Sequence, residues 1–354
     1  MRYARYFVLL SIVLFSAGCS QEEDYVLSGF MPSEQSYLYP VDSLDLERLN
    51  VLMPEDIAKF ERYLVIKKYS TQNHVDIVDT ETGQVKHIIP RGRSDSEALN
   101  VGSFQLEDHN VLVYDVSQMK YLSYDLSSLE GGNEDISVTH YKFYETDSGI
   151  VSKPFSINKR GSLMVAVGLW EGDMWYRTMT QEGELRGGIG MVDFEELDGM
   201  TIAEKSSFHL SSHISISPSG DKVVCALTKA GAISVADVKD GKLTESRRRL
   251  YQSPKVESVG QKNMPLLAFS GESIRTFCDV YSSDERIAVL YSGLPLKSED
   301  QPSYQCNYLL IYDWNLNPIK SYYLHNSVNS FWMEGNRLYG ASSYPKSSVY
   351  IYEL

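Results

Sequence analysis

The chain has 354 residues, a formal net charge of −14, and 43% hydrophobic residues. This acidic balance argues against nucleic acid as a partner, because that binding depends on Lys and Arg residues that neutralise phosphate. A negatively charged chain is also repelled by anionic membrane surfaces, so we expect any membrane attachment to come from something other than charge attraction.

The first nineteen residues have the pattern of a secretory signal peptide. Arg2 and Arg5 precede an apolar run at residues 6–15, which ends in Ser16-Ala17-Gly18-Cys19. The run is about half of the ~20 residues that a membrane-spanning helix needs. Small residues directly before a cysteine resemble the lipobox of bacterial lipoproteins, and this resemblance implies cleavage after residue 18 and lipid attachment at Cys19. The alternative is a plain cleaved signal with an incidental cysteine.

Residues 19–36 are predicted to form a lipidated acidic tether. The segment Ser20-Gln21-Glu22-Glu23-Asp24 resembles the export signal of surface lipoproteins of the Bacteroidota, and the alternative is an ordinary solvated acidic run. Removal of residues 1–18 changes the net charge to −16, so the acyl chains would carry the membrane attachment. We therefore expect anchoring to the outer membrane in the cell envelope, in either the periplasmic or the surface-exposed leaflet.

From residue 37 to residue 354, one pattern recurs. A polar turn-like cluster is followed by a short apolar run, and later by a second strand that ends in an acidic residue. The apolar runs begin at positions spaced 48, 52, 60, 64 and 51 residues apart, and these positions are Tyr63, Val111, Leu163, Val223, Ile287 and Leu338. Clusters of Gly, Asn, Asp and Ser between such runs indicate hairpin turns.

Repeated β-units of this length predict a six-bladed β-propeller, an all-β fold. The 336 residues of the mature chain give 56 residues for each unit, which suits a four-stranded blade with generous loops. A β-sandwich or two small β-domains would favour cleaner apolar and polar alternation. The last unit ends one strand short, and residues 37–53 contain strand-like pieces that we expect to supply this strand and close the ring.

Two local motifs, with the start of the chain and the six units, resemble the TolB-like six-bladed propeller lipoproteins of the Bacteroidota. Ser217-Pro218-Ser219-Gly220-Asp221 is similar to the Ser-Pro-Asp-Gly turn of TolB-type blades, with Ser219 in place of the acidic residue. Residues 90–97 resemble a Gly-Arg-Gly-x-Gly-x-Glu loop between such blades and include Arg91, Arg93 and Glu97 as candidate binding residues. The resemblance implies a fold and a cellular address, but no reaction.

Sequence motifs for catalysis are absent. The chain has no Gly-x-Ser-x-Gly elbow, His-Glu-x-x-His motif or Walker loop, so we assign no catalytic residue and no cofactor. His209 and His213 have a spacing that suits a metal on a helix, but the surrounding sequence predicts a strand, where four residues span ~13 Å. No metal site is therefore predicted. The glycines of residues 187–190 are interpreted as a loop between blades.

One aromatic segment is a candidate binding surface. Residues 170–177 surround a Gly-Asp turn with the candidate residues Trp170, Asp173, Trp175, Tyr176 and Arg177. Such side chains are enriched at recognition sites, and aromatic faces also stack on sugar rings. The alternative is a hairpin whose aromatic side chains pack between blades. Similarly, the basic cluster at residues 247–249 suits an anionic partner or a solvated strand end.

The sequence predicts a lipid-anchored propeller that acts as a binding or protein-interaction module in the cell envelope, with an envelope protein or a glycan as its ligand. This prediction rests on the fold, which does not by itself determine function. The alternatives are an envelope enzyme acting on glycans, a lyase or hydrolase with its site on the channel face of the propeller, and a purely structural envelope protein.

Overall fold

The computed structural model describes residues 35–70, 72–129, 136–141, 152–259 and 267–354, which belong to one compact unit. The predicted signal peptide and Cys19 lie outside these residues. Within the described part, no helix is long and apolar enough to cross a membrane. Almost all of the regular structure is β-strand, and the sheets follow one another along the chain.

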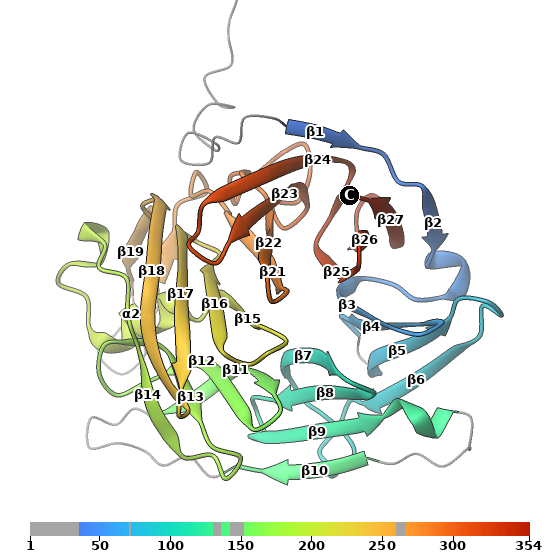
Figure 1. The fold of residues 1–354 in the computed structure, drawn as a ribbon, viewed down its shortest axis with the longest axis horizontal. Coiled ribbons are helices and arrows are strands. Elements are labelled where there is room, and N and C mark those ends of the chain that lie inside the picture. The colour runs from blue at the N-terminus through green and yellow to red at the C-terminus, as the bar shows by residue number, and fades with distance from the viewer. Residues whose placement is uncertain (1–34, 71, 130–135, 142–151, 260–266) are drawn as a thin grey trace, which may run out of the picture. The chain divides into compact units, whose positions relative to one another are not determined.

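Six sheets form the blades of a β-propeller, which confirms the predicted architecture (Figure 1). Within each blade, consecutive strands of the chain pair antiparallel from the innermost strand outward. The strands are, blade by blade, β3 (Pro54–Phe60), β4 (Tyr63–Lys68), β5 (Asn73–Asp79) and β6 (Val85–Pro90); β7 (Val101–Glu107), β8 (Asn110–Asp115), β9 (Lys120–Asp125) and β10 (Ile136–His140); β11 (Lys153–Arg160), β12 (Leu163–Leu169), β13 (Met174–Met179) and β14 (Leu185–Gly190); β15 (Ser212–Ile216), β16 (Lys222–Leu227), β17 (Gly231–Lys239) and β18 (Lys242–Gln252); β21 (Phe277–Ser282), β22 (Arg286–Tyr291), β23 (Cys306–Asp313) and β24 (Pro318–Val328); and β25 (Ser330–Glu334), β26 (Arg337–Ser342) and β27 (Ser348–Glu353).

Short helices and one extra hairpin lie in the connections between strands. They are η1 (Glu47–Leu49), η2 (Leu126–Leu129), η3 (Glu195–Leu197), α2 (Ile202–His209), β19 (Val256–Ser258) and β20 (Leu267–Phe269). Helix α2 begins at a capping box, in which Thr201 accepts a hydrogen bond from the Glu204 amide and the Glu204 side chain bonds back to Thr201.

The innermost strands of the six blades form a closed ring. They contact one another in the order β3, β7, β11, β15, β21, β25 and back to β3. Between the second and third blades, the Lys159 amide donates to Gln105 Oε1 at 2.6 Å. Between the last and first blades, Asn329 Nδ2 donates to the Pro54 carbonyl at 3.0 Å. Hydrogen bonds therefore link neighbouring blades as well as strands within a blade.

The hydrophobic core lies between the blades, and the apolar runs of the repeat form it. Each run is the second strand of its blade, and in both β16 and β22 every residue after the first is buried. One cluster, for example, joins Val165 of β12 to Val223 of β16. Because these strands are covered on both faces by neighbouring blades, their sequences are continuously apolar rather than alternating.

Two strands near the N-terminal end of the described chain lie on the outer edges of the last two blades. β1 (Gln35–Leu38) pairs in parallel with β24, and β2 (Asp42–Asp45) pairs antiparallel with β27. Figure 1 shows these blue strands beside the red C-terminal ones. β2 is thus the fourth strand of the sixth blade, whose other three strands come from the C-terminal end.

Two local expectations differ from the structure. Residues 187–190 belong to strand β14 rather than to a loop, and a Cβ on Gly188 would come within 2.5 Å of the Tyr176 carbonyl oxygen. The glycine is therefore explained by close approach to the neighbouring strand. The segment that contains His209 is helical, because the capping box initiates α2 where the sequence was interpreted as strand.

Candidate functional site

Three long connections lie on one face of the propeller. In a blade of four antiparallel strands, the link to the next blade and the turn between the second and third strands share a face. This face carries residues 91–100, the segment with η3 and α2, and residues 292–305. We call it the loop face, and because binding residues concentrate on loops held by a rigid scaffold, it is the face where we look for a ligand site.

A central cavity of about 820 Å³ lies along the axis and is lined by the innermost strands of all six blades. Its polar residues toward the loop face include Glu55 and Asp56 of β3, Ser103 of β7, His213 of β15 and Asp279 of β21. We call this end the cavity mouth. The volume of the whole cavity is in the range of binding pockets for small molecules.

Four of the innermost strands have an irregularity at the cavity mouth. The register with the second strand shifts immediately before Asp56, Ser103, Ser156 and Asp279, each near the start of its strand. A β-bulge bends the strand and changes the direction of the side chain that follows it. This repeated bulge explains why polar side chains line the mouth at equivalent positions of four blades.

Asp56 and Asp279 are brought together by Ser330, at the start of β25 between their two strands. Ser330 Oγ donates to Asp56 Oδ1 at 2.8 Å, and the amide of Phe331 donates to Asp279 Oδ2 at 3.0 Å. Burial raises the pKa of both carboxyl groups. The pKa of Asp279 reaches about 8, with the negative charge of Asp56 as the second cause. At neutral pH one carboxylic acid therefore lies beside a second, ionisable carboxyl group.

One basic side chain, Lys67, lies beside this pair. Lys67 forms an ion pair with Glu55 at 3.0 Å, and its charge also attracts Asp56. Burial lowers the pKa of His213 to about 4, with smaller contributions from the positive charges of Arg275 and Lys67, so this imidazole is neutral at neutral pH. The buried Nε of Arg275 has no hydrogen-bond partner among the described residues. The mouth thus offers neutral donors, acceptors and charges of both signs.

The structure offers no cluster for a metal ion in its described part, where no group of three His, Cys, Asp or Glu side chains is suitably placed. His209 and His213 have separate surroundings. His209 ends α2 and is bonded to the Val192 amide and the Lys205 carbonyl, whereas His213 lines the cavity. Cys225, Cys278 and Cys306 are buried free thiols.

The aromatic candidates Trp170, Trp175 and Tyr176 are fully buried. Their polar atoms are bonded inside the protein: Trp175 Nε1 donates to Ser212 Oγ at 2.8 Å, and Tyr176 Oη is 2.9 Å from Ser234 Oγ. The segment is a hairpin between β12 and β13. The rings of Trp175 and Tyr176 pack with the fourth blade, and the ring of Trp170 packs with the second blade. This placement favours the packing alternative for the three rings, since a buried ring cannot stack on a ligand.

The polar candidates beside this hairpin have different environments. Arg177 lies 5.9 Å from the centre of the Trp170 ring and its Nε donates to the Arg186 carbonyl at 2.9 Å, while burial lowers its pKa. Asp173 is exposed in the turn. Within the basic cluster, Arg248 donates to the Gly190 carbonyl at 2.8 Å and so links the third and fourth blades.

The loop at residues 91–100 is folded around Glu97 and lies on the loop face. Glu97 Oε2 accepts from the Ser94 amide at 2.8 Å, and such hydrogen bonds lower its pKa. Lys120, almost completely buried, donates to the Ser94 carbonyl and holds the loop from below. Glu97 therefore stabilises its own loop, whereas Arg91 and Arg93 are exposed.

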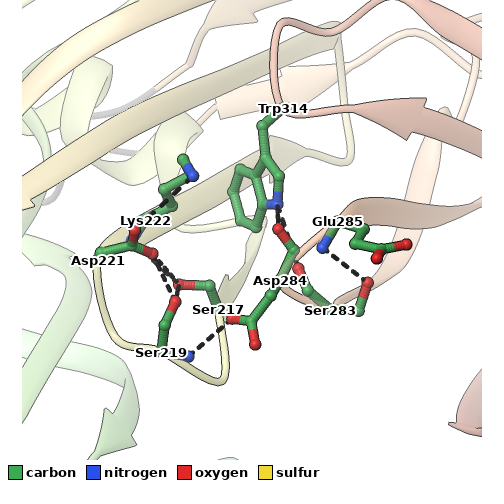
Figure 2. Close-up of polar contacts among 8 residues, drawn as sticks. All are labelled: Ser217, Ser219, Asp221, Lys222, Ser283, Asp284, Glu285 and Trp314. Atoms are coloured by element: carbon green, nitrogen blue, oxygen red, sulfur yellow. Dashed lines mark hydrogen bonds and ion pairs between the residues drawn. The ribbon is translucent and has the colours of Figure 1, made fainter.

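The Ser-Pro-Ser-Gly-Asp turn lies between β15 and β16, on the face opposite to the loop face, and Figure 2 shows its contacts with the next blade. Ser217 Oγ and Ser219 Oγ both donate to Asp221 Oδ1, at 3.0 and 2.6 Å. The Ser219 amide donates to Asp284 Oδ1 in the next blade, at 2.8 Å. With Gly220 in the left-handed region, these bonds give the turn a structural role.

The sequence analysis did not identify the cavity-mouth residues. Asp56 and Asp279 come from the first and fifth blades and meet only when the ring closes. One signal was available: they occupy the same position in their respective units, next to the start of the innermost strand.

Comparison with known proteins supports the fold. No family model and no curated protein matches the chain. Among solved structures, it is similar to a gluconolactonase from Xanthomonas campestris, with 10% identity over 91% of this chain and 98% of the other and a TM-score of 0.50. It is also similar to a Bacteroides fragilis protein assigned as exported (11% identity, 89% and 93% coverage, TM-score 0.48) and to BamB from Moraxella catarrhalis (13%, 90% and 100%, 0.41). At such identities the likeness extends to the fold alone.

Proposed function

We propose that the chain is a lipid-anchored binding module of the cell envelope, with a small polar ligand held in the cavity mouth. The signal-like N-terminus and Cys19 support the address. The observation that carries the binding function is the Asp56–Ser330–Asp279 group at the end of an 820 Å³ cavity. Desolvated polar groups at such a place are costly for folding, which makes a binding role the simplest explanation for them.

The binding proposal is tested by thermal unfolding of the full mature chain in detergent, with a panel of amino acids, neutral sugars, amino sugars and sugar acids. We expect at least one class to raise the melting temperature of the wild type, because a ligand that binds only the folded state stabilises it. Asp279→Asn should abolish this increase, whereas Asp237→Asn, which changes an exposed carboxylate of the fourth blade, should retain it. No increase with any class, or an equal increase in Asp279→Asn, would contradict the proposal.

A second candidate function, acid–base catalysis on glycans, is favoured by one observation. Burial and Asp56 keep Asp279 protonated near neutral pH, as a general acid requires, and Asp56 can serve as the partner carboxylate. Asp56→Asn and Asp279→Asn should then each abolish the release of new sugar ends from envelope glycans while both variants still unfold cooperatively as folded proteins. Binding without turnover in the wild type would leave the binding module as the function.

The address is tested separately from the ligand. Metabolic labelling with a radioactive fatty acid should mark the wild type and not Cys19→Ser, and an equally labelled variant would refute the anchor. Protease added to intact cells distinguishes the surface-exposed leaflet from the periplasmic one. Crosslinking of the anchored protein in its native cells, with mass spectrometry of what is captured, tests for a protein partner.

A further inference from the structure

A second groove lies on the side of the propeller, between the fifth and sixth blades and separate from the central cavity. It has a volume of about 260 Å³. Its lining consists of amide, hydroxyl and aromatic side chains, together with one proline, and comprises Gln301, Asn307, Tyr323, His325, Asn326, Ser327, Tyr344, Pro345 and Tyr350. This described lining contains no carboxylate, lysine or arginine, in a protein with 47 Asp and Glu residues.

The groove is built by an unusually large bulge in β24. Cys306 of β23 is paired with Val328 and Tyr308 with Tyr323, so that Asn307 alone stands opposite residues 324–327. Leu324 still pairs with Leu38 of β1 on the other side, whereas residues 325–327 have no partner in β23 and form the bulge that lines the groove.

Side chains from two blades fix this bulge. Asn307 Nδ2 donates to the Leu324 carbonyl at 2.9 Å, and the buried Tyr352 donates from Oη to the Asn326 carbonyl at 2.8 Å. The amide of Asn326 in turn donates to Tyr352 Oη at 3.3 Å. The backbone of Asn326 is thus held, whereas its side-chain amide has no bond to any described residue.

Aromatic rings from β1 and the segment after it extend the groove. The Tyr39 ring lies 4.7 Å from the His325 ring, and the Tyr37 ring lies 5.6 Å from that of Tyr323. Tyr37 and Tyr39 are 68% and 66% exposed, and Tyr344 on the opposite blade is 39% exposed. Exposed aromatic rings that cluster beside a groove are typical of a binding site.

We propose that this groove binds a neutral sugar unit of a glycan. Amides and hydroxyls both donate and accept hydrogen bonds, as the hydroxyl groups of a sugar require, and tyrosine and histidine rings provide faces for its C–H groups. The absence of charged side chains in the lining favours uncharged sugars over uronic acids or phosphorylated sugars, whose anionic groups would lose hydration without a compensating charge. The volume is just below the ~300 Å³ at which pockets for drug-sized ligands begin, which suits one sugar unit with the rest of the chain outside.

Isothermal titration calorimetry of the full mature chain tests the proposal with neutral hexasaccharides of glucose, mannose, xylose and galactose, and with oligogalacturonate as the charged comparison. At least one neutral hexasaccharide should bind, and oligogalacturonate should not. Asn326→Ala and Tyr39→Ala should weaken binding about tenfold or more, the scale expected of hot-spot side chains. The control is Tyr69→Ala, which removes an equally exposed tyrosine, 71% accessible, from the first blade and should bind like wild type.

Several outcomes would overturn the proposal. They are the absence of binding for every neutral hexasaccharide at millimolar concentration, equal binding of oligogalacturonate, or wild-type affinity in both groove variants. Asp279→Asn separates the two sites, because it alters the central cavity and leaves the groove intact. Loss of saccharide binding in that variant alone would place the sugar in the cavity mouth and remove it from the groove.

Discussion

Replacement of His209 by glutamine tests how the helix α2 is held against the third and fourth blades. The imidazole is 1% exposed, accepts a hydrogen bond from the Val192 amide through Nε2 at 3.1 Å, and donates from Nδ1 to the Lys205 carbonyl at 2.7 Å. These two bonds require the neutral ring, since a protonated Nε2 would face another N–H. Burial accordingly lowers the pKa of His209 to about 4.

The pH dependence follows from the direction of this shift. The unfolded chain takes up a proton on His209 below pH 6.5, whereas the folded chain does so only near pH 4, so stability falls as the pH decreases between these values. From the two pKa values, the loss is about 2 kcal/mol at pH 5 and about 3 kcal/mol at pH 4. Above pH 7 the contribution is absent. His209→Gln retains a donor and an acceptor but cannot be protonated in this range.

The measurement is urea unfolding of wild type and His209→Gln at pH 7.5 and pH 5.0. At pH 7.5 the difference in unfolding free energy gives the cost of the substitution itself. At pH 5.0 the wild type should lose about 2 kcal/mol relative to the variant, because the other titrating groups act on both proteins alike. An unchanged difference between the two pH values would refute a neutral, buried His209.

Three further predictions concern the ring and its centre. Gly188→Ala should lower the unfolding free energy by at least ~1 kcal/mol, whereas Gly187→Ala, whose Cβ would meet no atom within 4 Å, should change it by less than ~0.5 kcal/mol; equal effects in urea unfolding would contradict the close approach in β14. Asp279→Asn should be increasingly stabilising from pH 4 to pH 8, because the raised pKa means that ionisation of this half-buried acid is unfavourable over this window; a gain independent of pH in urea titrations would argue against it. Deletion of residues 20–50, which removes β1 and β2, should give an insoluble or poorly cooperative protein, and calorimetry showing wild-type melting would exclude a role in closing the ring.

The second strands of the blades could be predicted because their environment leaves a direct mark on the sequence. They are buried on both faces, so runs such as those beginning at Val223 and Ile287 are apolar throughout. The innermost strands carry no such mark. One face of β15 or β25 borders the cavity, and each is only five residues long, with serine at its start. Polar and apolar residues then mix as they do in loops, and these strands were not assigned.

Amphipathic side chains explain the uncertainty about the aromatic hairpin. Tryptophan and tyrosine suit both a recognition surface and a blade interface with one internal hydrogen bond, and the sequence around Trp175 is compatible with either. The decisive fact is that Ser212 and Ser234, both in the fourth blade, lie where the Trp175 and Tyr176 polar atoms need partners. No property of residues 170–177 alone could predict this.

The cavity mouth was missed for a different reason, which also shows how it could be found. In a propeller, the nth residue of every innermost strand lies at a similar height around one axis, so residues far apart along the chain become neighbours. Asp56, Ser103, Ser156 and Asp279 follow the same bulge in four blades. Adjacent carboxylates in the sequence point to opposite faces of a strand, whereas carboxylates at equivalent positions of different blades converge. For this fold, then, acid pairs should be sought by superposing the repeat units, and the pair that such a superposition selects is Asp56 with Asp279, which Ser330 joins.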